Sequence, residues 1–215
     1  MKFTPLDYIL NGLLMSLIGL CAYALASWSS AISALGSYHV IVSVAVFLIA
    51  YGVLSAFSIR LLLHIRPLRL GEFDVSHPNF VYWKVLMVVF DMGRFALNPF
   101  TTMPLRPLIA KLYGATIGKN VAIGGTIEDA HLITIGDGVV IGNQSLISGN
   151  MTMNGKILFG RVSIGNCVTI GANSVIMPNV EIGDNVLLGV GSVVLPGTRI
   201  PQGESWRGNP ARKWQ

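Results

Sequence analysis

The side chains best suited to moving protons gather around one irregular stretch in the second half of the chain. His131 is the last histidine in the sequence, and it ends the segment Glu128–His131. Asn150 follows at about the distance of one β-helical coil, just before a stretch that carries Lys156 and Arg161. Imidazole titrates close to neutral pH, so His131 is a candidate general base. The plainer interpretation of His131 is a partly exposed histidine in a turn.

The acidic residues nearby are weaker candidates for chemistry. Glu128 and Asp129 shortly precede His131 and could orient a base. Asp137, Glu181 and Asp184 fall at polar positions between apolar ones, where solvated turns are expected, and we interpret them as structural.

A hexad period positions all of these residues. Aliphatic side chains, most of them followed by glycine, recur in one phase up to Ile147 and again from Ile164 onward. Short periods of this kind are typical of β-helices, in which each hexad forms a short strand and a turn. No hexad can bury its aliphatic side chain alone, so stacked coils must supply the core. The repeating positions are Ile117, Ile123, Ile135, Ile141, Ile147, Ile164, Ile170, Ile176, Ile182, Leu188, Val194 and Ile200.

The period breaks between Ile147 and Ile164, whose separation is one residue short of three full hexads. A β-helix tolerates such a slip only if the extra chain leaves the stack. We therefore expect a loop over residues 148–163 that turns at Asn154-Gly155, a dipeptide typical of tight turns.

The aliphatic–glycine pairs at hexad spacing resemble those of the hexapeptide-repeat acyltransferases, in particular a membrane-anchored branch. The resemblance implies a left-handed parallel β-helix with three hexads per coil, and hence four to five coils here. In that family a loop such as 148–163 borders an active site at the seam between the subunits of a trimer. The family pattern is Ser or Gly, then His, a variable loop, and Val-x-Ile-Gly. This chain reads Ser148-Gly149-Asn150, the loop, and then Val162-Ser163-Ile164-Gly165.

Asn150 therefore occupies the position at which the resemblance leads us to expect the histidine that acts as general base. An amide cannot accept a proton near neutral pH, and losing a general base typically costs about 100- to 10,000-fold in rate. Three explanations stay open: an engineered exchange that traps substrate, a natural member that lost activity, or a base supplied by another residue such as His131. The intact pattern around Asn150 favours the first.

The resemblance also implies an acyl-coenzyme A donor, acetyl-coenzyme A above all. The C-terminal segment Trp206–Lys213 resembles the Gly-x-Pro-Ala ending of the family. Its basic side chains would meet the phosphates, since arginine matches phosphate through its planar fork. Small residues at the coil corners would let the thin pantetheine arm approach. The expected donor-binding residues are Gly171, Ala172, Gly189, Arg207, Arg212 and Lys213. The alternative is that Pro210 ends the stack and the basic tail meets lipid.

Two apolar runs near the N-terminus, Tyr8–Trp28 and Tyr38–Ser58, contain no charged residue. A helix needs about 20 residues to cross the hydrocarbon core of a bilayer. The composition agrees, because only 12% of residues are charged and about 25% is usual in soluble domains. A signal peptide is the rival interpretation of the first run, but Asp7 and the second run favour a retained helical hairpin.

The basic residues that flank the runs predict their orientation. Lys2 precedes the first run, and Arg60, Arg66 and Arg69 follow the second. Positive residues stay on the cytoplasmic side, so both termini and the β-helix are expected in the cytoplasm, on an inner or plasma membrane. The formal charge of +5 then indicates lipid or an anionic ligand. Nucleic acid is not expected, because aromatic residues do not interleave with the basic ones.

Residues 71–115 contain a strongly apolar run that is interrupted by Lys84. We expect an interfacial helix, with Tyr82 and Trp83 near the headgroups and Lys84 and Arg94 on anionic lipid. The alternative is a helix packed on the domain that follows.

The predicted organisation is a transmembrane helical hairpin at 1–70, a juxtamembrane segment at 71–115, a β-helix at 116–200 with the loop 148–163, and a basic tail at 201–215. The leading function is a membrane-anchored, acyl-coenzyme A-dependent O- or N-acyltransferase, acting as a homotrimer on a hydroxyl or amine acceptor, which could be lipid-linked or a saccharide. The second hypothesis is an inactive membrane scaffold that keeps the trimeric β-helix. No metal is expected, because a zinc site of three histidines cannot be built from the single histidine of the repeat.

Overall fold

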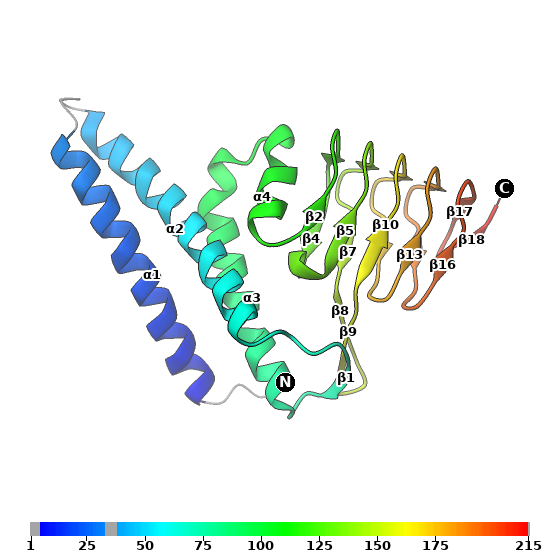
Figure 1. Ribbon diagram of the computed structural model, residues 1–215, viewed down its shortest axis with the longest axis horizontal. Helices are drawn as coiled ribbons and strands as arrows, with labels where there is room; N and C mark the ends of the chain where they lie inside the picture. Colours follow the sequence, from blue (N-terminus) through cyan, green and yellow to red (C-terminus); the bar gives the residue numbers. More distant parts are fainter. Residues whose placement is uncertain (1–4, 33–37, 215) are drawn as a thin grey trace. The chain divides into compact units, whose positions relative to one another are not determined.

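The computed structural model describes residues 5–32 and 38–214 and divides the chain into two compact units (Figure 1). The helical unit comprises residues up to Leu68 together with Pro78–Thr101. The β-helical unit comprises Arg69–His77 together with the chain from Thr102 onward. The division differs from the sequence-based one, because the expected juxtamembrane segment 71–115 contributes to both units.

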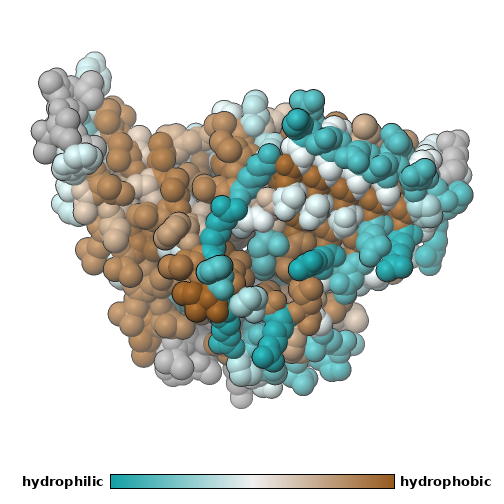
Figure 2. All heavy atoms as spheres, viewed as in Figure 1, coloured by the Kyte–Doolittle hydropathy of each residue, from teal (hydrophilic) through white to brown (hydrophobic). Residues whose placement is uncertain are grey.

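The helical unit contains α1 (Pro5–Ile32) and α2 (His39–Ile65), which pack on each other. Both helices are long and apolar enough to cross a membrane, by length and composition. Large apolar side chains such as Leu13, Leu17 and Phe57 are exposed along them, and brown spheres dominate this unit in Figure 2. Water would disfavour such a surface, whereas hydrocarbon would not. Lys2, which contributed to the predicted orientation, lies outside the described residues.

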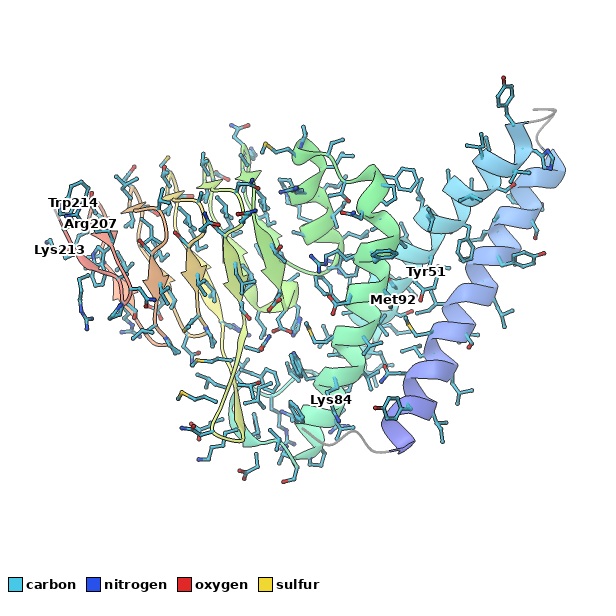
Figure 3. All side chains as sticks on the ribbon, turned by 180° about the vertical axis from the view of Figure 1, so that it is seen from behind. Tyr51, Lys84, Met92, Arg207, Lys213 and Trp214 are labelled. Atoms are coloured by element: carbon cyan, nitrogen blue, oxygen red, sulfur yellow. The ribbon has the colours of Figure 1, made fainter. Side chains whose placement is uncertain are left out.

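Helix α3 spans Pro78–Leu97 and is followed by a 3-10 turn at Asn98–Phe100. Some of the residues of α3 that were expected to face lipid are buried. Trp83 and Lys84 are buried, and the Lys84 ammonium lies 5.3 Å from the ring centre of Phe80, one helical turn earlier (Figure 3). Arg94 is exposed and pairs with Asp91 at 3.5 Å. The prediction that Trp83 and Lys84 meet headgroups is therefore wrong, because the apolar stem of a lysine can pack inward over an aromatic ring.

The main part of the β-helical unit starts with a 3-10 turn at Met103–Leu105 and α4 (Arg106–Leu112), and the chain then coils through three parallel sheets. The first sheet holds β2 (Thr116–Ile117), β5 (Ile133–Ile135), β10 (Val162–Ile164), β13 (Glu181–Ile182) and β16 (Arg199–Ile200). The second holds β3 (Ala122–Ile123), β6 (Val140–Ile141), β11 (Thr169–Ile170), β14 (Leu187–Leu188) and β17 (Ser205–Arg207), with β18 (Arg212–Lys213) at its end. The third holds β4 (Thr126–Glu128), β7 (Leu146–Ser148), β12 (Val175–Ile176) and β15 (Val193–Val194).

The repeating aliphatic side chains fill one common interior, as the period predicts. Each of them is at most 6% exposed, from Ile117 to Ile200. The period misses one member, because Ile127 is also buried and pairs with Ile147, slightly more than one regular coil later. In a regular coil the partner stands three hexads away, as for Ile176 and Val194. The coil that begins at Ile127 is longer because a short 3-10 turn, Ala130–Leu132, is built into the corner after β4.

Polar side chains close the corners between sheets. The Asp137 carboxylate accepts a hydrogen bond from the backbone N–H of Lys119 at 2.6 Å, and the Asp184 carboxylate accepts one from the backbone of Asn166 at 2.6 Å. Exposed Glu181 pairs with Arg199 on the next coil at 3.1 Å. These contacts agree with the structural interpretation of the acidic residues.

The C-terminal segment is an ordered cap, not a free tail. Strand β17 pairs in parallel with β14, so the second sheet continues to Arg207. Strand β18 then folds back antiparallel on β17. The boundary predicted at residue 200 falls short because the last hexad of this sheet buries no aliphatic residue in phase, and Leu188 instead pairs with Trp206.

Candidate functional site

The chain leaves the β-helix as an excursion at the corner that follows β7. Ile147 pairs with Ile176, and their separation is nearly five hexads. A regular coil separates partners by three hexads, as with Ile176 and Val194. The difference is not a whole number of hexads, so this insertion explains the phase slip in the sequence. Its neck is closed by the backbone N–H of Gly160, which donates to the carbonyl of Gly149 at 2.9 Å.

The excursion is a β-hairpin where a loop was expected. Strands β8 (Asn150–Met153) and β9 (Lys156–Phe159) pair antiparallel, and Asn154 and Gly155 turn between them with φ of 51° and 74°. Two successive positive φ values are typical of the type I′ turn, which matches the twist of the flanking strands. Strand β1 (Gly71–Asp74) adds a third strand beside β9.

Asn150 is the first residue of this hairpin and is tied to the preceding coil. Its amide Nδ2 donates to Oδ2 of Asp129 at 2.6 Å. Its backbone N–H donates to the hydroxyl of Ser148 at 3.2 Å. Asp129 is only 5% exposed and holds a left-handed backbone with φ of 49°. A buried carboxylate thus fixes the orientation of the side chain at position 150.

Glu128 also reaches this group, through Ser148. The Ser148 hydroxyl lies 3.3 Å from Oε2 of Glu128 and 3.0 Å from the carbonyl oxygen of Asn150. Both acidic residues that the sequence suggested as orienting groups therefore lie at this site, and Asp129 makes the direct contact.

His131 follows the same corner but has a different environment. Its Nε2 is buried and has no hydrogen-bond partner among the described residues. Burial lowers the pKa of His131 to about 4, because the charged imidazolium loses its hydration. A group with this pKa is a poor proton acceptor near neutral pH. The backbone of His131 packs against Gly114, where an added Cβ would meet the His131 Cβ at 3.2 Å.

Lys156 and Arg161, the basic residues expected in the loop, lie at different places. Lys156 is in β9 and pairs with Glu72 of β1 at 2.6 Å. The hydrogen bond to Glu72 and the negative charge of that residue raise the pKa of Lys156. Arg161 follows the neck of the excursion and lines an open groove over the first sheet, together with Glu181 and Arg199.

The small residues expected to admit the donor are in contact with neighbouring coils. A Cβ added to Gly171 would collide with the backbone of Val190, and one added to Gly189 would lie 2.9 Å from the Cβ of Arg207. The carbonyl of Ala172 accepts a backbone hydrogen bond from Gly191 at 2.8 Å. Glycine is therefore required here by the close approach of the coils, independently of any ligand.

The basic residues expected to meet phosphate lie in the C-terminal cap, where Figure 3 shows Arg207 and Lys213. Arg207 and Arg212 are exposed and directly opposite each other in the pairing of β17 with β18. The Arg207 guanidinium lies 4.2 Å from the ring centre of Trp214. Lys213 pairs with Glu204 at 2.7 Å, and this hydrogen bond lowers the pKa of Glu204.

No group of three or more His, Cys, Asp or Glu side chains that could hold a metal ion is found in residues 5–32 and 38–214.

The family model described as bacterial transferase hexapeptide (six repeats) matches residues 161–196. The matched coils of the β-helix therefore consist of hexapeptide repeats. A comparison of the chain with curated proteins found no match. The β-helix continues on both sides of the matched residues, from β2 to β17, and the coils before the excursion keep the same strand register as those after it.

Solved structures similar to this chain include three acetyltransferases. A hexapeptide-repeat-containing acetyltransferase from Vibrio cholerae is 21% identical with a TM-score of 0.49, and the match covers 57% of this chain and 85% of that one. A maltose O-acetyltransferase from Clostridium difficile 630 is 24% identical with a TM-score of 0.45, covering 69% and 93%. A galactoside acetyltransferase in complex with coenzyme A is 23% identical with a TM-score of 0.46, covering 76% and 82%. These TM-scores are below 0.5, so the assignment rests on the matched repeats and on the observed β-helix.

Two features of the site were missed in the sequence. Strand β1 pairs with the excursion, although Phe73 and Ile157 are far apart in the chain. The alternation in Gly71-Glu72-Phe73-Asp74 was a local signal for a strand. The contact between Arg207 and Trp214 had no comparable signal, because it depends on the chain folding back on itself at the cap.

Proposed function

We propose that the protein is a membrane-anchored acyltransferase that moves an acyl group, in the first place acetyl, from coenzyme A to a hydroxyl or amine. The observation that carries the proposal is the placement of residue 150. Among the residues that the structure describes, one hairpin leaves the stacked hexapeptide repeats, and residue 150 is the first residue of that hairpin. The buried carboxylate of Asp129 lies 2.6 Å from the side chain of residue 150. The description of the matching family, bacterial transferase, supports the reaction class.

The proposed chemistry is direct attack of the acceptor on the thioester. The acceptor oxygen or nitrogen forms a bond to the acyl carbon, its proton passes to a base, and the carbon–sulfur bond breaks to release the coenzyme A thiolate. With histidine at position 150, Asp129 would accept the imidazole N–H and hold the other nitrogen toward the acceptor. The amide of Asn150 keeps the hydrogen bond to Asp129 but cannot take the proton. The chain as it stands would therefore bind substrates and turn them over slowly.

The donor is proposed to bind with its phosphates at the C-terminal cap. Like charges directly opposite each other on neighbouring strands destabilise a sheet, and Arg207 and Arg212 have this arrangement. A phosphate group between or beside the two guanidinium groups would relieve the repulsion through charge-assisted hydrogen bonds. Lys213 contributes less charge, because Glu204 already pairs with it.

We propose that α1 and α2 anchor the protein in the bilayer, with both ends and the β-helix on the cytoplasmic side. The length, apolar composition and exposed apolar surface of the two helices support an anchor. An anchored enzyme meets acceptors at the membrane, which favours lipid-linked acceptors, including lipid-linked saccharides. The β-helix is proposed to act as a homotrimer. The exposed apolar side chains Val140 and Leu187 on the second sheet support burial between subunits.

The second candidate function is an inactive membrane scaffold that retains the trimeric β-helix. Asn150 is the observation that favours it, because the residue removes the proton acceptor and leaves the surrounding geometry ordered.

A coenzyme A titration combined with restoration of histidine separates the two functions. We expect the full chain in detergent to bind coenzyme A by calorimetry. We expect Asn150→His to release thiol from acetyl-coenzyme A, with a panel of lipid-linked and free sugars as acceptors, about 100-fold faster or more than the parent chain. Asn143→His makes the same change at an exposed corner of the β-helix and should gain nothing. Absence of both binding and gained turnover would favour the scaffold.

A further inference from the structure

The segment between α2 and α3 is part of the β-helical unit, and its strand belongs to the same sheet as the excursion (Figure 1). Strand β1 pairs antiparallel with the whole of β9, from Gly71 opposite Phe159 to Asp74 opposite Lys156. The backbone N–H of Val75 extends the contact by donating to the carbonyl of Gly155 at 3.1 Å. The segment therefore covers the hairpin from its neck to its turn.

Side chains fasten the two strands on both faces of this small sheet. On one face, Phe73 lies 6.3 Å from Phe159 and 4.8 Å from His77, measured between ring centres. On the other face, Glu72 pairs with Lys156 at 2.6 Å. Ile157 and Phe159 are fully buried. An apolar contact and an ion pair thus act on opposite sides of one strand.

An isolated two-stranded hairpin is marginally stable in water, and a third strand with a buried face is what makes such a unit persist. The excursion consists of β8 and β9 only, and β8 is the outer strand of the sheet. Without β1, the hairpin would keep its turn and its neck but lose the ladder along β9. Order in the excursion therefore depends on a segment that lies far earlier in the chain.

Residue 150 is connected to β1 through β9. Gly71 is opposite Phe159, and Phe159 is opposite Asn150, so the three residues form one row across the sheet. The side chain of Asn150 holds its contact with Asp129 only while the backbone of β8 is held in place. A shift of the hairpin would move residue 150 relative to Asp129, and displacements of about 1 Å can cost about 100-fold in rate.

We propose that residues 71–77 are a strap that positions residue 150 by holding the excursion as a three-stranded sheet. This role in catalysis rests on the proposed acyltransferase function, whereas the structural part does not. The strap lies in the chain segment between the end of α2 at Ile65 and the start of α3 at Pro78. Phe73 and Glu72 are positioning residues, since neither is paired with Asn150 or Asp129.

Hydrogen exchange on the full chain in detergent tests the strap itself. Phe73→Ala should speed amide exchange in residues 150–159 about tenfold or more and leave the buried strands β11 to β14 unchanged. Phe95→Ala, the same substitution at an exposed phenylalanine of α3, is the matched control and should not change exchange in the excursion. Glu72→Lys places a second positive charge beside Lys156 and leaves the apolar face of the sheet unchanged. This variant therefore tests the strap if Phe73→Ala fails to fold. Unchanged exchange in residues 150–159 in the folded variants would overturn the proposal.

The positioning role needs a readout that a loss of stability alone would not move. In the Asn150→His protein, adding Phe73→Ala should lower kcat about tenfold or more and change the KM for acetyl-coenzyme A by less than about twofold, because the donor binds at the cap. Phe73→Leu should restore most of kcat. Equal loss in kcat and donor affinity would contradict positioning. If Asn150→His shows no turnover, the proposed function fails while the exchange experiment still decides whether the strap exists.

Discussion

Asparagine and histidine at position 150 share the ability to donate a hydrogen bond to Asp129, and they differ in the ability to accept a proton from substrate. The 2.6 Å contact between Nδ2 of Asn150 and Asp129 is the hydrogen bond that a histidine at this position would make in the proposed mechanism. A carboxylate that is 5% exposed is costly to leave without partners. The amide at position 150 thus stabilises the corner even if it does not catalyse a reaction.

At the residue scale, the burial of His131 predicts how the stability of the folded protein depends on pH. Its pKa in the folded protein is lowered to about 4 by burial, below the value of about 6.5 expected in the unfolded chain. As pH falls below about 6.5, His131 takes up a proton in the unfolded chain before it does so in the folded protein. The free energy of unfolding therefore declines between about pH 6.5 and about pH 4, and His131 does not change it above about pH 6.5. The loss should be on the order of 3 kcal/mol.

The measurement for His131 is amide exchange of the most protected β-helix strands across this pH range, after correction for intrinsic exchange rates. His131→Leu should remove most of the decline, because it deletes both the titrating group and a buried nitrogen that lacks a hydrogen-bond partner among the described residues. His39→Leu changes an exposed histidine of α2 and should keep the decline. A decline of the same size in His131→Leu would show that the acid sensitivity comes from another group.

At the scale of elements, the regular coils and the two irregular segments have different physical origins. The regular coils depend on neighbours three hexads away and on buried aliphatic side chains that recur in every coil. The excursion and the C-terminal cap both contain an antiparallel pair of strands, β9 on β8 and β18 on β17. Antiparallel pairing lets the chain turn back within a short loop, which a parallel coil cannot do. Both segments carry the residues that we propose for chemistry and donor binding.

The proposed phosphate site in the C-terminal cap predicts that Arg207 contributes to the affinity for coenzyme A. Arg207→Ala should weaken coenzyme A binding about tenfold, because a charge-assisted hydrogen bond is worth roughly 1.5–3 kcal/mol and part of it is screened at an exposed site. The titration of the full chain should show the loss for coenzyme A and a smaller one for dephospho-coenzyme A. Arg199→Ala removes an exposed arginine from the first sheet, where it pairs with Glu181, and is the matched control. Equal weakening by both variants would mean that only net charge matters.

At the scale of the whole molecule, the two cysteines provide a test of topology. Cys167 is exposed on the β-helix, and Cys21 lies within α1, in the first candidate span. If the β-helix is cytoplasmic, an impermeant thiol reagent should label Cys167 in inside-out membrane vesicles and leave it unlabelled in right-side-out vesicles. Cys21 should stay protected in both, since hydrocarbon excludes a charged reagent.

Single-cysteine variants make the labelling unambiguous. Cys21→Ser retains Cys167 as the only thiol, and Cys167→Ser retains Cys21. Labelling of Cys167 from the right-side-out face would reverse the orientation predicted from Lys2, Arg60, Arg66 and Arg69. Extraction of the full chain by alkaline carbonate would contradict the membrane anchor altogether.

The sequence by itself determined the β-helix and the two apolar helices. A hexad repeat and a run of about 20 apolar residues are local patterns, and each specifies its structure without reference to distant parts of the chain. Ile135, Ile164 and Ile182 are buried in one interior, as the period predicts. The loop 148–163 could also be located, because the slip of phase marks the place where the chain must leave the stack, and the resemblance to the family pattern singled out position 150 within it. Ile127 escaped the period because the turn before it is shorter, and the corner after it, at Asp129, is longer than in a regular hexad.

Tertiary structure alone decided what surrounds position 150 and what holds it. The hydrogen bond to Asp129 depends on a short insertion in one coil and a long one in the next, and no local pattern reveals how these meet. The burial that lowers the pKa of His131 depends on Gly114 and the coil around it. Pairing of β1 with β9, and of Arg207 opposite Arg212, joins strands through backbone hydrogen bonds that nearly any residue can make. Such pairings leave little trace in side-chain periodicity, so they became visible only in the folded chain.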